Sequence, residues 1–385
     1  MARALRPPPR RVTVYLDYQA TTPLAPEALA AMRPWLEDKF ANPHSSHKFG
    51  REAAAAVEVA RAQILDALMG TRTFLPPGGQ KGTCPPGKLY FTSGATEAAN
   101  WALKGIGRRR IVTLATEHAC VLDTLEWLST RGHDIEIVPV GTDGLVDLDR
   151  LRAAVGDETG LVAAMVVNNE IGVIQPIAEI ARIAHEGGAL FFCDAVQGFG
   201  RVPIPSDACD MIALSAHKIH GPKGVGALWV RDDLKLEPLL HGGGQEGGLR
   251  SGTLSPALCA GFGAAAALLG PDDHEHVERL WSIARPSMRD WTLNGSEGRR
   301  YRGNLNLRRA GIDAARLISE VREVAFSAGS ACASGSGRPS HVLAALGLDR
   351  QAAASSIRLG FGRYTKEEEL GAALALVNEA AARQA

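Results

Sequence analysis

The fold is decided by LVAAMVVN at 161–168, ALFFCD at 189–194 and MIALS at 211–215. Each stretch is a short apolar run, and amphipathic segments separate such runs along the chain. Strands that are buried on both faces have this nearly continuous apolar character, because helices cover both faces of a parallel sheet. The pattern predicts an α/β fold in which a mostly parallel mixed sheet lies between helices.

Further strand candidates extend this pattern in both directions: KLYFT at 88–92, IVTLA at 111–115, IEIVPV at 135–140 and GALWV at 226–230. After about residue 255 the pattern changes. We expect helices at 256–269 and 273–290, short strands near 304–308, 324–327 and 355–361, and a closing helix from about 366. The sequence therefore predicts a large domain over 15–255 and a smaller α+β domain made of 1–14 and 256–385.

Composition limits the classes of function. The chain has 385 residues, 45% hydrophobic and 22% charged, which is typical of a globular protein of roughly two domains. Lys plus Arg and Asp plus Glu both number 42, so no net charge attracts nucleic acid or anionic lipid. No stretch reaches the ~18 apolar residues that a membrane helix requires. Small molecules and proteins are the expected partners, with no direct nucleic acid and no membrane.

Six cysteines, at 84, 120, 193, 209, 259 and 332, form no CxxC pair and have no metal-ligand spacing. Neither a disulfide framework nor a metal site is expected, and a reducing cytoplasm fits best. The basic start MARALRPPPRR lacks the apolar region of a signal peptide and predicts a flexible arm. The Gly- and Pro-rich segment 70–88 predicts a surface loop.

Two motifs predict an anion site and a buried acid. TSGATE at 92–97 follows a strand and opens a helix, whose N-terminus can bind phosphate, although Ser or Thr at this position more often only caps the helix. Asp194 ends a very apolar strand, where open α/β sheets bind ligands. Its carboxylate needs a cationic partner, for which a protonated pyridine nitrogen is one candidate. The alternative is an aspartate that caps the next helix.

A third motif, SAHKIHGPKG at 215–224, places Lys218 among Ser, His and Gly residues. Such a lysine can form a Schiff base with a carbonyl compound. The simpler interpretation is that Lys218 and Lys223 are solvent-facing loop charges. The flanking hydroxyl and imidazole groups, however, suit a phosphate better than bulk water.

Together these motifs resemble the cysteine desulfurases of the NifS/IscS type. The resemblance extends from LDYQATTP at 16–23 to SSIRLGFGR at 355–363, with the motifs in the family's order. They are TSGATE, EH at 117–118, VNNEIG at 167–172, DAVQ at 194–197, SAHK at 215–218, HGGGQEGGLRSGT at 241–253 and SAGSACAS at 327–334.

The resemblance implies a homodimeric, fold-type-I enzyme dependent on pyridoxal 5'-phosphate. It implies that Lys218 carries the cofactor, Asp194 contacts the pyridinium nitrogen, His118 stacks on the ring and Gln197 contacts its phenolic oxygen. The remaining cofactor-binding positions that it implies are Ala95, Thr96, Ser215 and His217 at the phosphate, Thr253 from the neighbouring subunit, and Asn169 and Ala216. Asn169 and Arg358 match the positions that bind the substrate carboxylate.

Cys332 matches the family's persulfide-forming cysteine. Its neighbours are Ala, Ser and Gly, so the stretch predicts a mobile loop rather than core, and its thiol is the better nucleophile candidate among the cysteines. The implied reaction converts L-cysteine to L-alanine and transfers the sulfur to Cys332. A sulfur-acceptor protein, such as an iron–sulfur scaffold or a sulfur carrier, would then receive it.

Three alternatives share parts of this pattern. A selenocysteine lyase or another pyridoxal-phosphate-dependent C–S lyase would use the same cofactor residues. A catalytically silent sulfur-carrier subunit would keep only the fold. A thiol redox sensor centred on Cys332 would want a nearby resolving cysteine, which the sequence lacks. The chain also departs from the family's usual pattern at Ala119 and Ala216, and it ends at RQA without the tail that some relatives use to dock a scaffold.

Overall fold

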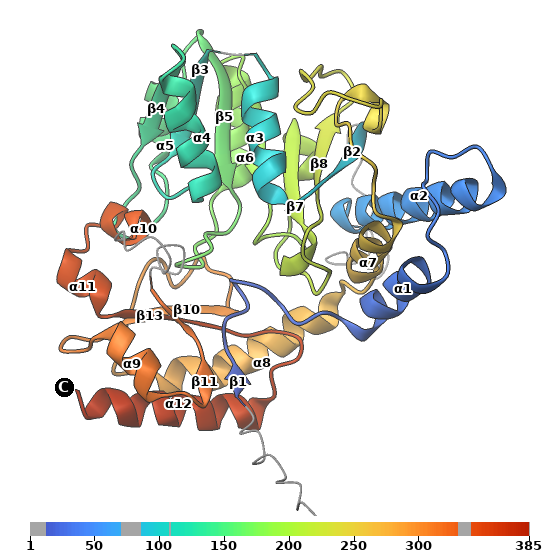
Figure 1. Ribbon diagram of the computed structural model, residues 1–385. Helices are drawn as coiled ribbons and strands as arrows, with labels where there is room; N and C mark the ends of the chain where they lie inside the picture. The colour runs from blue at the N-terminus through green and yellow to red at the C-terminus, as the bar shows by residue number, and fades with distance from the viewer. Residues whose placement is uncertain (1–12, 71–85, 108, 330–339, 385) are drawn as a thin grey trace, which may run out of the picture.

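The computed structural model describes residues 13–70, 86–107, 109–329 and 340–384 (Figure 1). The predicted N-terminal arm, nearly all of the predicted 70–88 loop, and Cys332 lie outside these ranges. Helices flank a large sheet in the upper part of Figure 1, and a smaller sheet with its own helices lies below it.

The large sheet has the strand order β2-β8-β7-β6-β5-β3-β4. Neighbouring strands from β7 to β4 are parallel, whereas β8 is antiparallel to both β7 and β2. This confirms the predicted mostly parallel mixed sheet. Its strands are β2 (Gly87–Thr92), β3 (Arg110–Leu114), β4 (Asp134–Val138), β5 (Thr159–Met165), β6 (Leu190–Asp194), β7 (Met211–Ser215) and β8 (Gly226–Arg231).

Helices bury both faces of this sheet. Along each strand, the side chains alternate between the two faces. In β5, Leu161 and Ala163 pack into one apolar cluster, while Val162 and Ala164 pack into the other. The helices α3 (Ala95–Gly105) and α4 (Ala119–Ser129) cover the first face. The second is covered by α2 (Lys48–Leu68), α5 (Leu148–Ala154), α6 (Ile177–Glu186) and α7 (Pro256–Ala267), with α1 (Pro26–Glu37) against α7.

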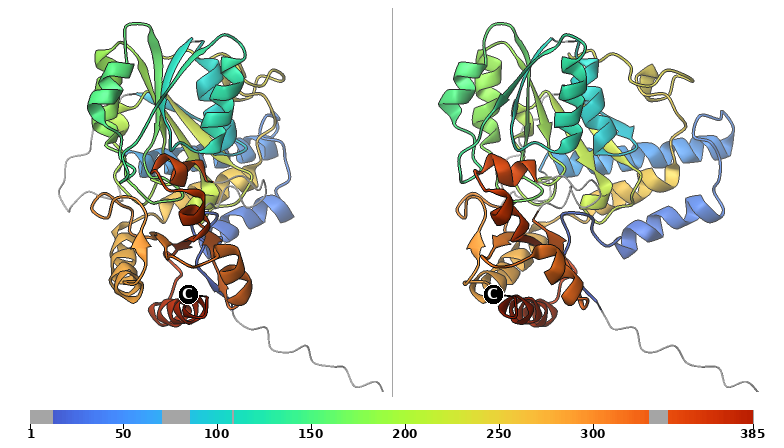
Figure 2. Two further views of the ribbon diagram at one scale, coloured as in Figure 1. Left: turned by 90° about the vertical axis from the view of Figure 1, so that its left-hand side faces the viewer. Right: turned by 60° about the vertical axis from the view of Figure 1, so that its left-hand side comes forward.

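The smaller sheet is antiparallel, with the order β12-β13-β10-β9, and β1 pairs in parallel with β11 beside it. Figure 2 shows α12 running along the outer side of this part. The elements are β1 (Val14–Tyr15), β9 (Thr292–Leu293), β10 (Asn304–Arg308), β11 (Val324–Ala325), β12 (Ser327–Ala328), β13 (Ser356–Gly360), α8 (Pro271–Ser287), α9 (Ala314–Glu320), α10 (His341–Ala345), α11 (Arg350–Ala354) and α12 (Glu367–Ala382), together with the 3₁₀ turns η1 (Ser206–Ala208), η2 (Ala216–Lys218) and η3 (Glu246–Gly248) elsewhere in the chain.

The two parts have separate apolar cores. The core of the small part contains Leu16, near the start of the chain, and apolar residues selected from between Leu280 and Ala381, near its end. Helix α7 instead packs on α1 and α2, and its Cys259 and Phe262 lie in the core of the large part. The predicted division at residue 255 stays a prediction.

The strand directions bring several segments to one edge of the large sheet. The parallel strands β3, β5, β6 and β7 end there, β2 ends there too, and β8 begins there. Open α/β sheets bind their ligands outside this carboxyl edge.

Candidate active site

A cavity of about 490 Å³ opens at the carboxyl edge, a volume that suits a small organic ligand. Arg358 from β13 and Gln19 from the segment after β1 complete its wall. The structure brings together ten of the predicted residues around it: Ala95, Thr96, His118, Asn169, Asp194, Gln197, Ser215, His217, Lys218 and Arg358.

Two of the predicted residues that the structure describes do not line this cavity. Ala216 is fully buried between Ser215 and His217, where the η2 turn directs its side chain away from the opening. Thr253 is exposed and lies outside the cavity wall of its own chain.

Lys218 ends η2, directly after β7. Its Nζ donates hydrogen bonds of 2.6 Å to the carbonyl oxygen of Gln19 and 2.7 Å to that of Ala20. Its own carbonyl oxygen accepts a hydrogen bond of 2.8 Å from Arg201. Both the amine and the backbone of this residue are therefore fixed at the cavity wall.

Asp194 ends β6, and only 6% of its surface is exposed. Its Oδ1 accepts a hydrogen bond of 3.0 Å from the backbone N–H of Val196. Burial raises the pKa of this carboxyl, and the nearby His118 and Lys218 only partly oppose that rise. Within the described ranges Asp194 forms no ion pair, so a ligand with a protonated nitrogen would supply the charge that this buried acid lacks.

His118 precedes α4 and caps it. Its Nδ1 accepts a hydrogen bond of 3.1 Å from the backbone N–H of Cys120, which assigns the proton of the neutral ring to Nε2. Burial lowers the pKa of His118. The neutral form of the ring is therefore favoured at pH 7.

The part of the cavity wall at the start of α3 is suited to a phosphate. Ala95 and Thr96 form the first turn of α3, whose backbone N–H groups have no partners within the helix. A Cβ atom at Gly226 would lie 2.7 Å from Gly94, so only glycine permits β8 to pass so close to this helix start. His217 also lines the cavity, and burial followed by the charge of Lys218 lowers its pKa to about 4.

Arg358 is 1% exposed. Its Nη1 donates to the carbonyl oxygen of Asn169 at 2.9 Å, and its Nη2 donates to Oδ1 of Asp17 at 2.7 Å. Its Nε has no hydrogen-bond partner within the described ranges. The guanidinium is thus a fixed, incompletely satisfied cation, the type of group that binds a carboxylate.

The sequence did not identify Asp17, Gln19 or Arg201, each of which holds a predicted site residue. The first two belong to LDYQATTP, a stretch already quoted for its resemblance, which was the available signal. Arg201 follows Gln197 by four positions, and no motif marked it.

The residues on either side of the segment 330–339 are anchored near this cavity. The N–H of Gly329 donates to the carbonyl oxygen of Ser356 at 2.7 Å, and Oγ of Ser340 donates to Oε2 of Glu170 at 2.5 Å. Glu170 directly follows Asn169, which lines the cavity. The ends of the segment that carries Cys332 therefore lie close to the predicted substrate-binding residues.

The fold and site define a class of protein. A model of the family described as "Aminotransferase class-V" matches residues 14–372, and the chain belongs to that family. No described helix is long and apolar enough to cross a membrane. The described ranges also contain no group of three or more His, Cys, Asp or Glu that could hold a metal ion.

Within the family the chain is similar to proteins named cysteine desulfurase IscS. It is 44% identical to that of Rickettsia bellii and 41% identical to that of Rickettsia prowazekii, each over 94% of this chain and 90% of the relative. Among solved structures, a NifS-like protein from Rickettsia africae has a TM-score of 0.84 at 29% identity, over 96% of this chain and 99% of that one. A structure described as SspA in complex with cysteine has a TM-score of 0.79 at 33% identity, over 92% and 100%.

Proposed function

We propose that the protein is a cysteine desulfurase that binds pyridoxal phosphate in the carboxyl-edge cavity and converts L-cysteine to L-alanine. One observation carries the proposal: the amine of Lys218, the unpaired carboxylate of Asp194 and the start of α3 face one cavity. These are the groups that a pyridine aldehyde with a phosphate requires. The names of the relatives point to the same substrate.

The residues of the wall have distinct tasks in binding this cofactor. Lys218 would attach to its aldehyde, and Asp194 would pair with its ring nitrogen. His118 would cover the ring, and Gln197 would contact the phenolic oxygen. The phosphate would lie against Ala95, Thr96, Ser215 and His217, beside the buried Ala216. When bound, the cofactor supplies an electron sink for the α-carbon of an amino acid.

The chain's own groups bind the substrate and move its protons. Arg358 and Asn169 would bind the carboxylate of L-cysteine and thereby hold its α-carbon near Lys218. The amine of Lys218 would take the α-proton, and Nε2 of His118 would exchange a second proton. The thiolate of Cys332 would attack the substrate sulfur, so an S–S bond forms as the C–S bond breaks.

The product on Cys332 is a persulfide, which a sulfur-acceptor protein would receive. Iron–sulfur cluster assembly is the route that the IscS relatives suggest. The anchored positions of Gly329 and Ser340 support access of Cys332 to the cavity. Among the cysteines that the structure describes, Cys193, Cys209 and Cys259 form no disulfide, which fits a reducing compartment such as the cytoplasm.

A homodimer is part of this proposal. Thr253, the residue expected to reach a neighbour's phosphate site, is exposed. Phe40 and Phe49 are 92% and 67% exposed, and both line a second surface hollow between α1 and α2. An apolar surface of this kind is typical of a protein interface.

The test is a product analysis with purified protein, pyridoxal phosphate, L-cysteine and a reductant. Equal amounts of sulfide and alanine are expected. Pyruvate in place of alanine would identify a β-eliminating lyase, and the absence of both products would contradict the proposal. A parallel reaction with L-selenocysteine distinguishes a selenocysteine lyase by its higher kcat/KM.

A further inference from the structure

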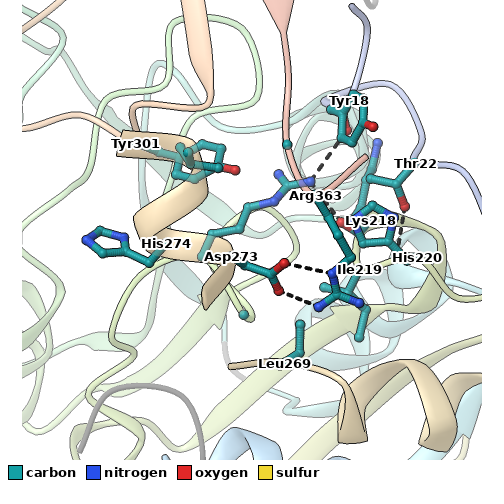
Figure 3. A pocket seen from close by; sticks show the side chains of 14 residues that line it. Tyr18, Thr22, Lys218, Ile219, His220, Leu269, Asp273, His274, Tyr301 and Arg363 are labelled. Atoms are coloured by element: carbon teal, nitrogen blue, oxygen red, sulfur yellow. Dashed lines mark hydrogen bonds and ion pairs between the residues drawn. The ribbon is translucent and has the colours of Figure 1, made fainter. Parts of the chain in front are cut away.

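Arg201 does not line the carboxyl-edge cavity but lines a neighbouring cavity that Lys218 also borders. Figure 3 shows this neighbouring cavity, with Lys218, Tyr301, Asp273 and Arg363 on its wall. Arg363 forms a two-pronged ion pair with Asp273 there. Within the described ranges Arg201 has no such carboxylate partner.

The donors of Arg201 are directed at neutral oxygens of the active-site wall instead. Nη1 donates to Oε1 of Gln197, and Nη2 donates to the carbonyl oxygens of Lys218 at 2.8 Å and Tyr18 at 3.4 Å. Its guanidinium carbon lies 5.3 Å from the centre of the Tyr301 ring. One planar side chain thus connects two predicted cofactor-binding residues.

These contacts fix the orientation of the Gln197 amide. A guanidinium has only donors, so the Gln197 atom that faces it must be the oxygen. On its other side, Nε2 of Gln197 lies 2.9 Å from the carbonyl oxygen of Gln19, which can only accept. The two neighbours therefore exclude the flipped amide.

The fixed orientation makes Gln197 a hydrogen-bond donor toward the cavity. An amide nitrogen has two hydrogens, and the carbonyl of Gln19 takes one of them. Gln197 lines the carboxyl-edge cavity, and its oxygen is already held by Arg201. A ligand oxygen at this wall would therefore receive an N–H and would be stabilised as an anion.

We propose that Arg201 is a positioning residue that holds Gln197 as a donor to the phenolic oxygen of the cofactor and so lowers the pKa of the cofactor's lysine linkage. The inference rests on the proposed function. A donor to that oxygen stabilises its anionic form. It also weakens the hydrogen bond that the oxygen accepts from the protonated nitrogen of the linkage. Loss of the donor is expected to raise this pKa by about one unit.

The experiment is a spectroscopic pH titration of the cofactor-loaded protein in a double-mutant cycle. Arg201→Met and Gln197→Leu are each expected to raise the pKa read from the visible absorbance, and the double variant is expected to show no further rise. Arg363→Met, which removes a cavity arginine that does not contact Gln197, is the matched control and keeps the wild-type pKa. Thermal melts verify that each variant folds. If Arg201→Met does not fold, Arg201→Gln takes its place.

Each other outcome has a definite meaning. An unshifted pKa in a folded Arg201 variant, while Gln197→Leu shifts it, overturns the positioning role. A rise that persists undiminished in the Gln197→Leu background shows that Arg201 acts only through its charge, which also overturns it. A wild-type protein that gains no visible absorbance with pyridoxal phosphate instead contradicts the proposed function itself.

Discussion

Asp17 and Arg358 are 341 positions apart in the chain, yet Oδ1 of Asp17 lies 2.7 Å from Nη2 of Arg358. The arginine side chain is 2% exposed and that of the aspartate 19%. The carboxylate therefore sets the plane of the guanidinium at the wall of the carboxyl-edge cavity. It also offsets part of the cost of keeping this cation out of water.

Asp17→Asn is expected to raise KM for L-cysteine about tenfold, because the amide forms a weaker, uncharged bond to Arg358 and the guanidinium loses its fixed plane. The change in kcat should be smaller. Steady-state kinetics measure both. Asp149→Asn, at an aspartate whose side chain is 94% exposed, is the control. An unaltered KM in Asp17→Asn would show that Asp17 does not orient Arg358.

Lys218→Ala is expected to abolish cysteine turnover and the visible band of a lysine-linked cofactor, since no other residue is proposed to form that bond. Lys223→Ala removes a second amine from the same cavity wall and should keep the linkage. Absorbance spectra after borohydride reduction, followed by peptide mapping, locate the modified lysine. Labelling at Lys223 in the wild type would refute the assignment.

Cys332→Ser is expected to retain the cofactor's colour but to lose at least 100-fold in desulfuration, because a hydroxyl cannot form the persulfide. Cys209→Ser serves as the control: the thiol of Cys209 donates to the carbonyl of Pro205, and a hydroxyl can replace it. Sulfide release with a reductant measures turnover. A wild-type rate in Cys332→Ser would exclude the persulfide route.

The stability of the protein should fall as the pH drops from about 6.5 to 4. His220 is 7% exposed, and burial followed by the charge of Arg363 lowers its pKa to about 4. As the pH falls, the unfolded chain takes up a proton at this histidine before the folded chain does. The contribution of His220 to the free energy of unfolding is therefore complete above pH 6.5 and is lost as acid is added. The loss from one such histidine is at most about 3 kcal/mol.

His220→Asn tests this origin of the pH dependence. Asparagine tolerates the positive φ of 69° at this position and does not titrate. Urea unfolding at pH 7 and pH 4.5 gives the free energy of unfolding at each pH. The difference between the two values should be smaller in the variant than in the wild type, and an equal difference would assign the acid sensitivity to other groups.

A variant with both Phe40→Ser and Phe49→Ser is expected to weaken the proposed homodimer without unfolding the chain, because both side chains are already mostly exposed. Sedimentation at several protein concentrations should show a shift toward the 40.8 kDa monomer. Leu376→Ser removes an exposed apolar side chain from α12 and should leave assembly unaltered. A wild-type dimer in the double variant would place the interface elsewhere.

Local sequence patterns were sufficient to predict the location of the candidate active site in the fold. Apolar runs identified the strands, and parallel strands necessarily bring their carboxyl ends to one edge. Asp194 and Ser215 end such strands, and Lys218 follows one within three residues. Their meeting at one cavity therefore followed from the order of the elements alone.

Local sequence patterns could not predict contacts between segments that are distant in the chain. The pairing of Asp17 with Arg358 depends on how β1 and β13 meet, and the contacts of Arg201 depend on where three loops cross. Ala216 illustrates a different limit. It lies between two cavity residues, but its side chain is buried in the core, which sequence adjacency does not reveal, and its role at the cofactor stays a prediction.

The pairing of β1 with β11 has a consequence for how the chain is made. Val14 lies opposite Val324, and Leu16 is buried among side chains from the last third of the sequence. Because a ribosome releases the chain from its N-terminus onward, Val14 and Leu16 must wait for nearly the whole polypeptide before they acquire their partners. Until then Leu16 stays exposed, so slow translation of the final helices should prolong the period in which the nascent chain depends on chaperones.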